Sequence, residues 1–173
     1  TGGLSARTGA SVGTTAALDA GSITVNNNAT ARTATTLGTL TTAGNVTLSA
    51  GGAVMQSGAI AATGLALNGT GGAYTLDHAG NAVTTLAANT GSVNYRQSGT
   101  LIVGTVNGVS GVSTTGTTQI ETTGAAANLT LNNAVTSGAT GDAIILKAGS
   151  DNAAGVSTCL LYTSPSPRDR TRS

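Results

Sequence analysis

The stretch NVTLSAGGAVMQSGAIAATGLAL, residues 45–67, carries the same short pattern at both of its ends. Val46 and Leu48 alternate with smaller or polar residues at its start, and Leu65 and Leu67 do the same at its end. Such alternation is typical of a strand with one buried face. From the spacing of the equivalent residues, the stretch predicts one turn of a structure that repeats about every 19 residues.

Similar segments of three or four residues recur along the chain, separated by Gly, Asn, Asp and Ser. These separators tolerate positive φ angles or form local side-chain-to-backbone hydrogen bonds, so they predict corners. The segments are SITV (22–25), NVTL (45–48), GLAL (64–67), AYTL (73–76), SVNY (92–95), TLIV (100–103), QIET (119–122), NLTL (128–131) and AIIL (143–146).

The same 19-residue lag aligns apolar positions in several of these segments. Changes in corner length would interrupt the lag, as between Ile23 and Val46, where the separation is longer, and between Leu131 and Leu146, where it is shorter. Chance is a competing explanation because Val, Leu and Thr are common here, but it rarely produces parallel series at one lag. The aligned sets are Leu48–Leu67–Leu86, Val93–Val112–Leu131, Val46–Leu65, Tyr74–Val93, Leu76–Tyr95, Val83–Ile102 and Leu101–Ile120.

About three short strands in each period predict an all-β fold, a right-handed parallel β-helix with about 19 residues per coil. A single coil buries almost nothing, whereas stacked coils about 4.8 Å apart pair their strands and close a narrow interior. About eight coils in residues 1–158 would form a rod about 40 Å long. Asn26 and Asn45 are candidates for a stacked asparagine ladder, with ordinary turn residues as the alternative.

An antiparallel sandwich of short strands is the structural alternative. It requires tight hairpins, and Asn-Gly pairs flanked by apolar residues occur at Asn68-Gly69 and Asn107-Gly108. The sandwich does not explain the 19-residue lag.

The C-terminal stretch CLLYTSPSPRDRTRS (159–173) differs in composition from the rest of the chain. It contains Cys159, Pro165 and Pro167, which are the only Cys and Pro residues. Residues 159–169 resemble the translation of a transposon-end adapter used in sequencing libraries. We therefore interpret 159–173 as a non-native, disordered tail and 1–158 as a shaft fragment truncated at both ends. A basic docking tail and a linker to a further domain are the alternatives.

Without this tail the chain is nearly neutral. Residues 1–158 contain four basic residues (Arg7, Arg32, Arg96 and Lys147) and five acidic ones (Asp19, Asp77, Glu121, Asp142 and Asp151). So few basic residues argue against a nucleic-acid partner and a polybasic membrane anchor. The longest apolar stretches are too short to cross a membrane, so we expect no membrane insertion. The lack of Cys in this part suits a protein that is exported unfolded.

Residues 51–116 resemble the repeat shaft of filamentous-haemagglutinin-like large exoproteins and adhesins. The phrases that carry this resemblance are GGAVMQSGAI (51–60), AGNAVTTLAA (79–88) and TLIVGTVNGVSG (100–111), and a looser similarity covers about 37–149. The resemblance implies a right-handed parallel β-helix that is secreted through an outer-membrane transporter of the two-partner route and displayed by a Gram-negative bacterium. Nothing here matches the family's secretion domain, and the shaft has no catalytic residues to carry over.

Residue types that could carry catalysis or bind metal are sparse. His78 is the only histidine, and although Asp77 precedes it, neighbouring residues on a strand point to opposite faces, so an exposed corner is the favoured interpretation. With one His and no Cys in 1–158, a zinc site lacks ligands. The segment GATGDAIIL (138–146) is faintly similar to calcium-binding β-roll repeats, but a single copy is better explained as a turn that enters a strand.

An enzyme, such as a polysaccharide lyase or hydrolase, would need a cluster of acids, and no two acids are separated by the predicted 19-residue lag. We therefore predict no enzyme activity, no catalytic residues, no metal and no cofactor. The Thr-rich stretches 35–44 and 113–124 could form an ice- or glycan-binding face, although Thr is also a common strand residue. Four Asn-x-Thr sequons, at Asn28, Asn45, Asn68 and Asn128, are possible glycosylation sites.

The function expected from these features is that of a structural shaft in a secreted, surface-displayed bacterial adhesin or exoprotein. Such a shaft would hold binding or effector modules away from the cell. Its expected partners are a host or neighbouring-cell surface, reached through modules outside this chain, and the outer-membrane transporter during secretion.

Overall fold

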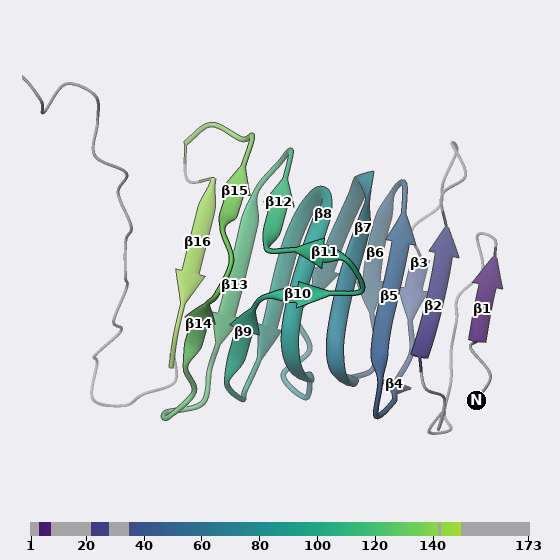
Figure 1. Ribbon diagram of the computed structural model, residues 1–173, viewed down its shortest axis with the longest axis horizontal. Coiled ribbons are helices and arrows are strands. Elements are labelled where there is room, and N and C mark those ends of the chain that lie inside the picture. Colours follow the sequence, from purple (N-terminus) through teal and green to yellow (C-terminus); the bar gives the residue numbers. More distant parts are fainter. Residues whose placement is uncertain (1–3, 8–21, 28–34, 142, 150–173) are drawn as a thin grey trace, which may run out of the picture.

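The computed structural model describes residues 4–7, 22–27, 35–141 and 143–149, with side chains described from Thr36 onward. The described residues contain strands and no helix (Figure 1). The predicted tail at 159–173 lies outside them. The strands are β1 (Leu4–Arg7), β2 (Ser22–Asn27), β3 (Thr35–Leu37), β4 (Leu40–Thr41), β5 (Asn45–Ala50), β6 (Ala53–Gln56), β7 (Ile60–Leu76), β8 (Ala82–Gln97), β9 (Leu101–Val103), β10 (Thr105–Val106), β11 (Val109–Ser110), β12 (Val112–Thr114), β13 (Thr118–Thr122), β14 (Leu129–Leu131), β15 (Val135–Ser137) and β16 (Ile144–Lys147).

Parallel strands from successive coils stack on one another, which confirms the predicted parallel β-solenoid (Figure 1). The first stack runs in the order β1-β2-β5-β7-β8-β12-β15. The second stack contains β3, β6, the end of β7, the end of β8, β13 and β16. β7 and β8 are long because each bends around the coil and contributes to both stacks. β4 pairs with the beginning of β7, and β9 pairs with β8 and β14.

The predicted 19-residue lag is correct for some neighbouring coils. Val46 pairs with Leu65 and Leu48 with Leu67 in the first stack. In the second stack Tyr74 pairs with Val93 and Leu76 with Tyr95. The longer step from Ile23 to Val46 is also a real pair.

Leu86 does not continue the column of Leu48 and Leu67, and this part of the prediction is wrong. Leu86 pairs with Leu65, and Leu67 pairs with Ala88, so the step here is longer than the predicted lag. The cause is the corner of β7, where the register shifts between Gly69 and Ala73. Three residues span that corner in β7 and a single glycine, Gly91, spans it in β8. Successive coils are therefore roughly 21 residues apart rather than 19.

The sets Val93–Val112–Leu131, Val83–Ile102 and Leu101–Ile120 predicted from the lag are also wrong. Beyond β8 the hairpin described below and longer corners lengthen the coils. The Asn26–Asn45 ladder is wrong as well, because Asn26 pairs with Ser49 and Asn45 with Ser22 and Gly64. The observed pairs are Ala62–Val83, Thr85–Ile102, Leu101–Leu129, Val103–Leu131, Ala88–Val112, Val112–Val135, Val93–Thr118, Tyr95–Ile120 and Ile120–Leu146.

The interior is a column of aliphatic side chains between the stacks. Alternate residues of β5 are buried, as the sequence pattern predicts, and Leu65, Leu67 and Leu86 have no exposed surface. Each fully buried Leu or Val contributes roughly 1.5–3 kcal/mol relative to an exposed one. Tyr74 and Tyr95 also lie inside, so two aromatic rings fill part of the interior.

One of the two Asn-Gly pairs forms a hairpin. β10 and β11 pair antiparallel, and the φ angles of Asn107 (49°) and Gly108 (84°) are both positive, as in the tight turns that favour Asn-Gly. Asn68-Gly69 instead lies inside β7. The antiparallel sandwich is therefore wrong as a fold, although one of its sequence signals marks a real local hairpin.

Candidate functional site

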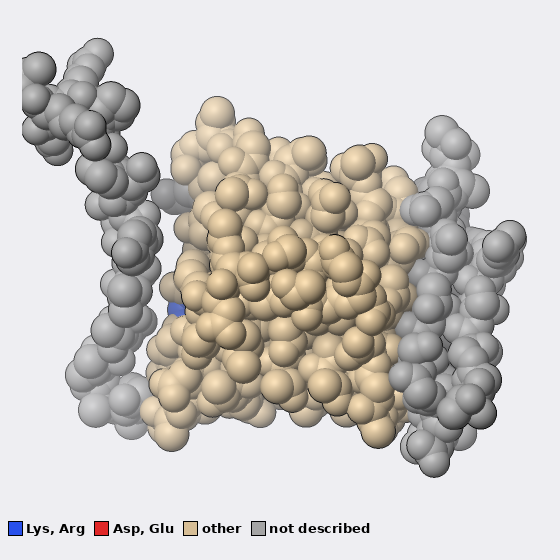
Figure 2. Space-filling model, viewed as in Figure 1, with Lys and Arg blue, Asp and Glu red and all other residues tan. Residues whose placement is uncertain are grey.

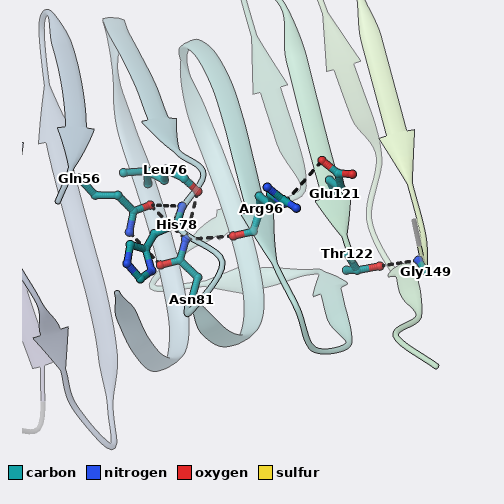
Figure 3. A network of polar contacts seen from close by, with 8 residues as sticks. All are labelled: Gln56, Leu76, His78, Asn81, Arg96, Glu121, Thr122 and Gly149. Carbon is teal, nitrogen blue, oxygen red and sulfur yellow. Dashed lines mark hydrogen bonds and ion pairs between the residues drawn. The ribbon is translucent and has the colours of Figure 1, made fainter. Parts of the chain in front are cut away.

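His78 lies on the exposed corner between β7 and β8, as predicted (Figure 3). Its Nδ1 accepts a hydrogen bond from the backbone N–H of Gly80 at 3.0 Å, which ties the ring to its own turn. The hydrogen bonds that the structure describes at His78 involve Gln56 and the backbone of Gly80. None of them brings a nucleophilic side chain to His78 or Asp77. Within the described ranges, no group of three or more His, Cys, Asp or Glu residues could hold a metal ion.

The most connected polar residue at this corner is Asn81, which is 2% exposed (Figure 3). Its Oδ1 accepts from the backbone N–H of Ile60 and from Gln56 Nε2, both at 2.8 Å. Its Nδ2 donates to Gln56 Oε1 at 3.0 Å and to the carbonyls of Leu76 (3.1 Å) and Arg96 (3.0 Å). Asn81 thus connects three successive coils from within.

Gln97 plays a similar part at the end of β8 and is 1% exposed. Its Oε1 accepts from the N–H of Val83 at 3.0 Å and from the Tyr95 hydroxyl at 2.7 Å. Its Nε2 donates to the carbonyls of Val83, Gly99 and Thr100. Buried polar groups of this kind are stable only when their partners are present, so Asn81 and Gln97 hold corners in place.

The two buried tyrosines are neutral structural groups. Burial raises the pKa of Tyr74 and of Tyr95 far above the ordinary value, because it disfavours the charged phenolate. The Tyr74 hydroxyl lies 2.6 Å from the carbonyl of Asn68 and 3.0 Å from that of Leu48. Neither phenol is poised to act as a base near neutral pH.

Three of the charged side chains that the structure describes, Arg96, Glu121 and Lys147, lie in one column on the second stack, and their signs alternate. Arg96 pairs in register with Glu121, and Glu121 with Lys147. Arg96 Nε lies 4.0 Å from Glu121 Oε2 (Figure 3). Asp77 directly follows Leu76, the last residue of β7 that pairs with β8. Acid is stacked on base rather than on acid, so the column holds no paired carboxylates.

The face that carries the hairpin is almost free of charge (Figure 2). Thr90, Thr114, Thr118 and Thr122 are buried rather than displayed. Among the described strands, no column of paired Thr residues continues over three coils. The described strands thus form no flat threonine row of the kind expected for an ice-binding face.

Two shallow hollows of about 320 Å³ each lie on the described surface. Thr75, Ser92, Asn94, Thr117 and Gln119 supply the polar lining of the first hollow. Around the second hollow lie Ala82, Val83, Thr84, Gln97, Gly99, Thr100 and Ile102. Neither lining contains a carboxylate, a histidine or a basic side chain, so neither hollow brings together groups for acid–base chemistry.

Within the segment 138–146, the described residues include a bend with a positive φ of 76° at Gly141 and the start of β16 at Ile144. These described parts agree with its interpretation as a turn entering a strand. Asp142 lies outside the described residues, as do Asp19, Asp151 and the sequon at Asn28. Of the other sequons, Asn128 is exposed, whereas Asn45 and Asn68 are half-buried.

Sequence reasoning did not single out Asn81 or Gln97. A buried asparagine at a corner looks the same in sequence as an exposed turn residue. The one available signal is position, because Asn81 follows the glycine that ends one turn and precedes the first residue of β8.

A family model described as repeats of unknown function (DUF5649) is similar to residues 25–90. Neither the comparison with curated proteins nor that with solved structures gave a match. The described part of the chain has no helix long and apolar enough to cross a membrane. The family similarity agrees with a repeat architecture and does not identify an adhesin.

Proposed function

We propose that this chain is a segment of the β-helical shaft of a secreted, surface-displayed bacterial adhesin or exoprotein. Its task is mechanical, to hold binding or effector modules at a distance from the cell. The observation that carries the proposal is the continuous stack of parallel strands from β1 to β15.

The use of polar residues supports the same role. Asn81 donates to backbone carbonyls of two neighbouring coils, and Gln97 bonds to the backbone of Val83, at the start of its own strand, and of Gly99 and Thr100. The column of alternating charges also stacks unlike charges between coils. These groups maintain coil register, which is what a load-bearing rod requires. The similarity of residues 51–116 to exoprotein shafts supplies the secreted, cell-surface setting of the proposal.

A glycan-binding face is the second candidate, and the first hollow is the observation in its favour. Thr75, Ser92, Asn94 and Gln119 come from successive strands of the second stack and line a neutral polar depression. Hydroxyl and amide side chains of this kind suit a neutral polysaccharide. A passive shaft, by contrast, needs no ligand there.

A display assay tests the shaft role. Residues 1–158 would be inserted between the last shaft coil and a terminal epitope tag of a β-helical exoprotein secreted by the two-partner route. We expect intact cells to display the tag and the insert to resist external protease. The matched control carries Leu65→Asp and Leu86→Asp, which place two charges in the interior and should abolish both properties. Failure of the unmutated insert to reach the surface would contradict the proposal.

A binding assay separates the two candidates. The purified chain would be titrated with immobilised neutral polysaccharides, with Asn94→Ala as the matched variant. The passive shaft predicts no saturable binding. Saturable binding that Asn94→Ala weakens would favour the glycan-binding face instead.

A further inference from the structure

We infer that residues 104–111 form a clasp, a hairpin inserted into one coil that reaches back across the neighbouring coils and holds them together. The inference rests on the strand register and contacts, and it does not depend on the shaft belonging to an adhesin. Figure 1 shows β10 and β11 lying across the first stack, roughly perpendicular to its strands.

The register shows where the hairpin is inserted. Val103, just before the hairpin, pairs with Leu86, and Val112, just after it, pairs with Ala88. A single residue, Ala87, joins Leu86 to Ala88, so one residue would suffice to join Val103 to Val112. The segment 104–111 stands in its place and is much longer than the coil needs.

Backbone hydrogen bonds close the base of this excursion. Gly104 N–H donates to the carbonyl of Leu86 at 3.0 Å, and Gly111 N–H donates to the carbonyl of Gly104 at 2.8 Å. Ala88 N–H donates to the carbonyl of Gly111, also at 2.8 Å. The chain thus leaves the coil at Gly104 and returns at Gly111 while the ladder with β8 continues on both sides.

The face beneath the hairpin is shaped to receive it. Val106 is 3% exposed and forms a cluster with Ala66 and Ala87, which have no exposed surface, and with Val109. This cluster is separate from the interior core. At Gly64 a Cβ atom would lie 2.8 Å from Val106 Cγ1 and 2.6 Å from Asn45 Oδ1, so a side chain there would conflict with the seated hairpin.

The tip of the hairpin bonds to a strand far away in sequence. Asn107 Oδ1 accepts from Asn45 Nδ2, and Asn107 Nδ2 donates to Thr47 Oγ1, both at 2.8 Å. Asn45 and Thr47 belong to β5, and β7 and β8 lie between β5 and the coil from which the hairpin leaves. Because each coil of a solenoid otherwise contacts only its neighbours, the hairpin adds a link between coils that do not touch.

This link changes how the solenoid opens. Without it, the backbone ladders that hold β5 are only those with β2 and β7. With it, opening of β5 must also release the hairpin tip from Asn45 and Thr47. We therefore expect β5, β7 and β8 to open together as one unit.

Excision of the hairpin from the full chain tests the inference. Deletion of Thr105–Gly111 leaves Gly104 to join Val103 to Val112. We expect unchanged far-ultraviolet circular dichroism and about tenfold or faster amide exchange in β5, with little change in β13. A deletion variant that does not fold would refute the statement that one residue suffices to join Val103 to Val112. Equal exchange in β5, or a uniform increase in all strands, would refute the clasp.

A second variant tests the clasp even if the deletion variant does not fold. Asn107→Gly keeps a residue that tolerates the positive φ of the turn but removes both hydrogen bonds to β5. The matched control is Asn89→Gly, which removes an exposed amide from β8 on the same stack. We expect faster exchange in β5 for Asn107→Gly than for Asn89→Gly. Equal exchange rates in the two variants would overturn the role of the tip.

Discussion

At the scale of single residues, the stability of the solenoid depends on a few buried polar side chains as well as on its aliphatic interior. Asn81 accepts from the backbone N–H of Ile60 and donates to the backbone carbonyls of Leu76 and Arg96. An unsatisfied buried group costs about 1–3 kcal/mol. A corner of this kind is therefore more sensitive to substitution than an exposed turn.

Replacing Asn81 should be strongly destabilising. Asn81→Leu keeps a similar volume but removes the hydrogen bonds of the buried amide to Ile60, Leu76 and Arg96, so we expect the free energy of unfolding to fall by about 2–4 kcal/mol. Urea denaturation monitored by circular dichroism measures this loss. Asn94→Ala, on the outer face of β8, is the control and should change stability by less than about 0.5 kcal/mol. A loss for Asn81→Leu no greater than that of the control would show that the corner network contributes little.

The buried tyrosines should make the fold sensitive to alkaline pH. Burial raises the pKa of both groups in the folded state, so their contribution is fully present below the unfolded value of about 10 and is lost as pH rises above it. Stability should be flat across neutral pH and then fall by about 1.4 kcal/mol per pH unit for each tyrosine. Urea midpoints between pH 7 and 11 measure the slope. The double variant Tyr74→Phe, Tyr95→Phe should flatten it, and an unchanged slope would refute this cause.

At the scale of strands and corners, small differences in corner length control the register. The alternation in residues 45–67 was enough to predict the pairs Val46–Leu65 and Leu48–Leu67. It could not place Leu86, because nothing in the pattern of apolar residues shows that the next corner of β7 is longer than that of β8. The hairpin had a readable signal in Asn107-Gly108, but that signal does not show that the hairpin lies on the coils instead of pairing within a sandwich.

The corner glycines should differ sharply in their tolerance of a side chain. At Gly72 a Cβ atom would lie 2.6 Å from Thr90 Oγ1 and 2.8 Å from both Ala50 O and the Tyr74 ring. We expect Gly72→Ala to cost about 1–3 kcal/mol, since these neighbours would have to move. At Gly99 the nearest neighbour would be 4.0 Å away, so Gly99→Ala is the matched control and should be nearly neutral. Thermal melting compares the two, and equal melting temperatures would contradict the close packing at Gly72.

At the scale of the whole molecule, the described chain is a stack of coils with few charges, and composition predicted this well. A nearly neutral chain with alternating apolar residues and Gly/Asn corners can bury its interior only by stacking. The candidate functional site was harder to predict, because hydrogen bonds and hollows arise from residues that are distant in sequence. The charged side chains of Arg96, Glu121 and Lys147 become neighbours only through the observed register.

Stacked coils should also promote association of the isolated fragment. We expect a purified piece of residues 1–158 to self-associate through unpaired strand edges of its end coils. Sedimentation velocity over a range of concentrations measures this. A stable monomer at all concentrations would contradict the expectation.

The most direct test of the central claim is disulfide mapping of coil register in a Cys159→Ser background. The structure pairs Asn68 with Asn89, whereas a uniform 19-residue repeat would pair Asn68 with Ala87. Adjacent parallel strands lie about 4.8 Å apart, within the range that a disulfide can bridge. The account predicts that Asn68→Cys with Asn89→Cys forms an intramolecular disulfide under mild oxidation and that Asn68→Cys with Ala87→Cys does not. Cross-linking of the second pair instead of the first, or of neither, would contradict it.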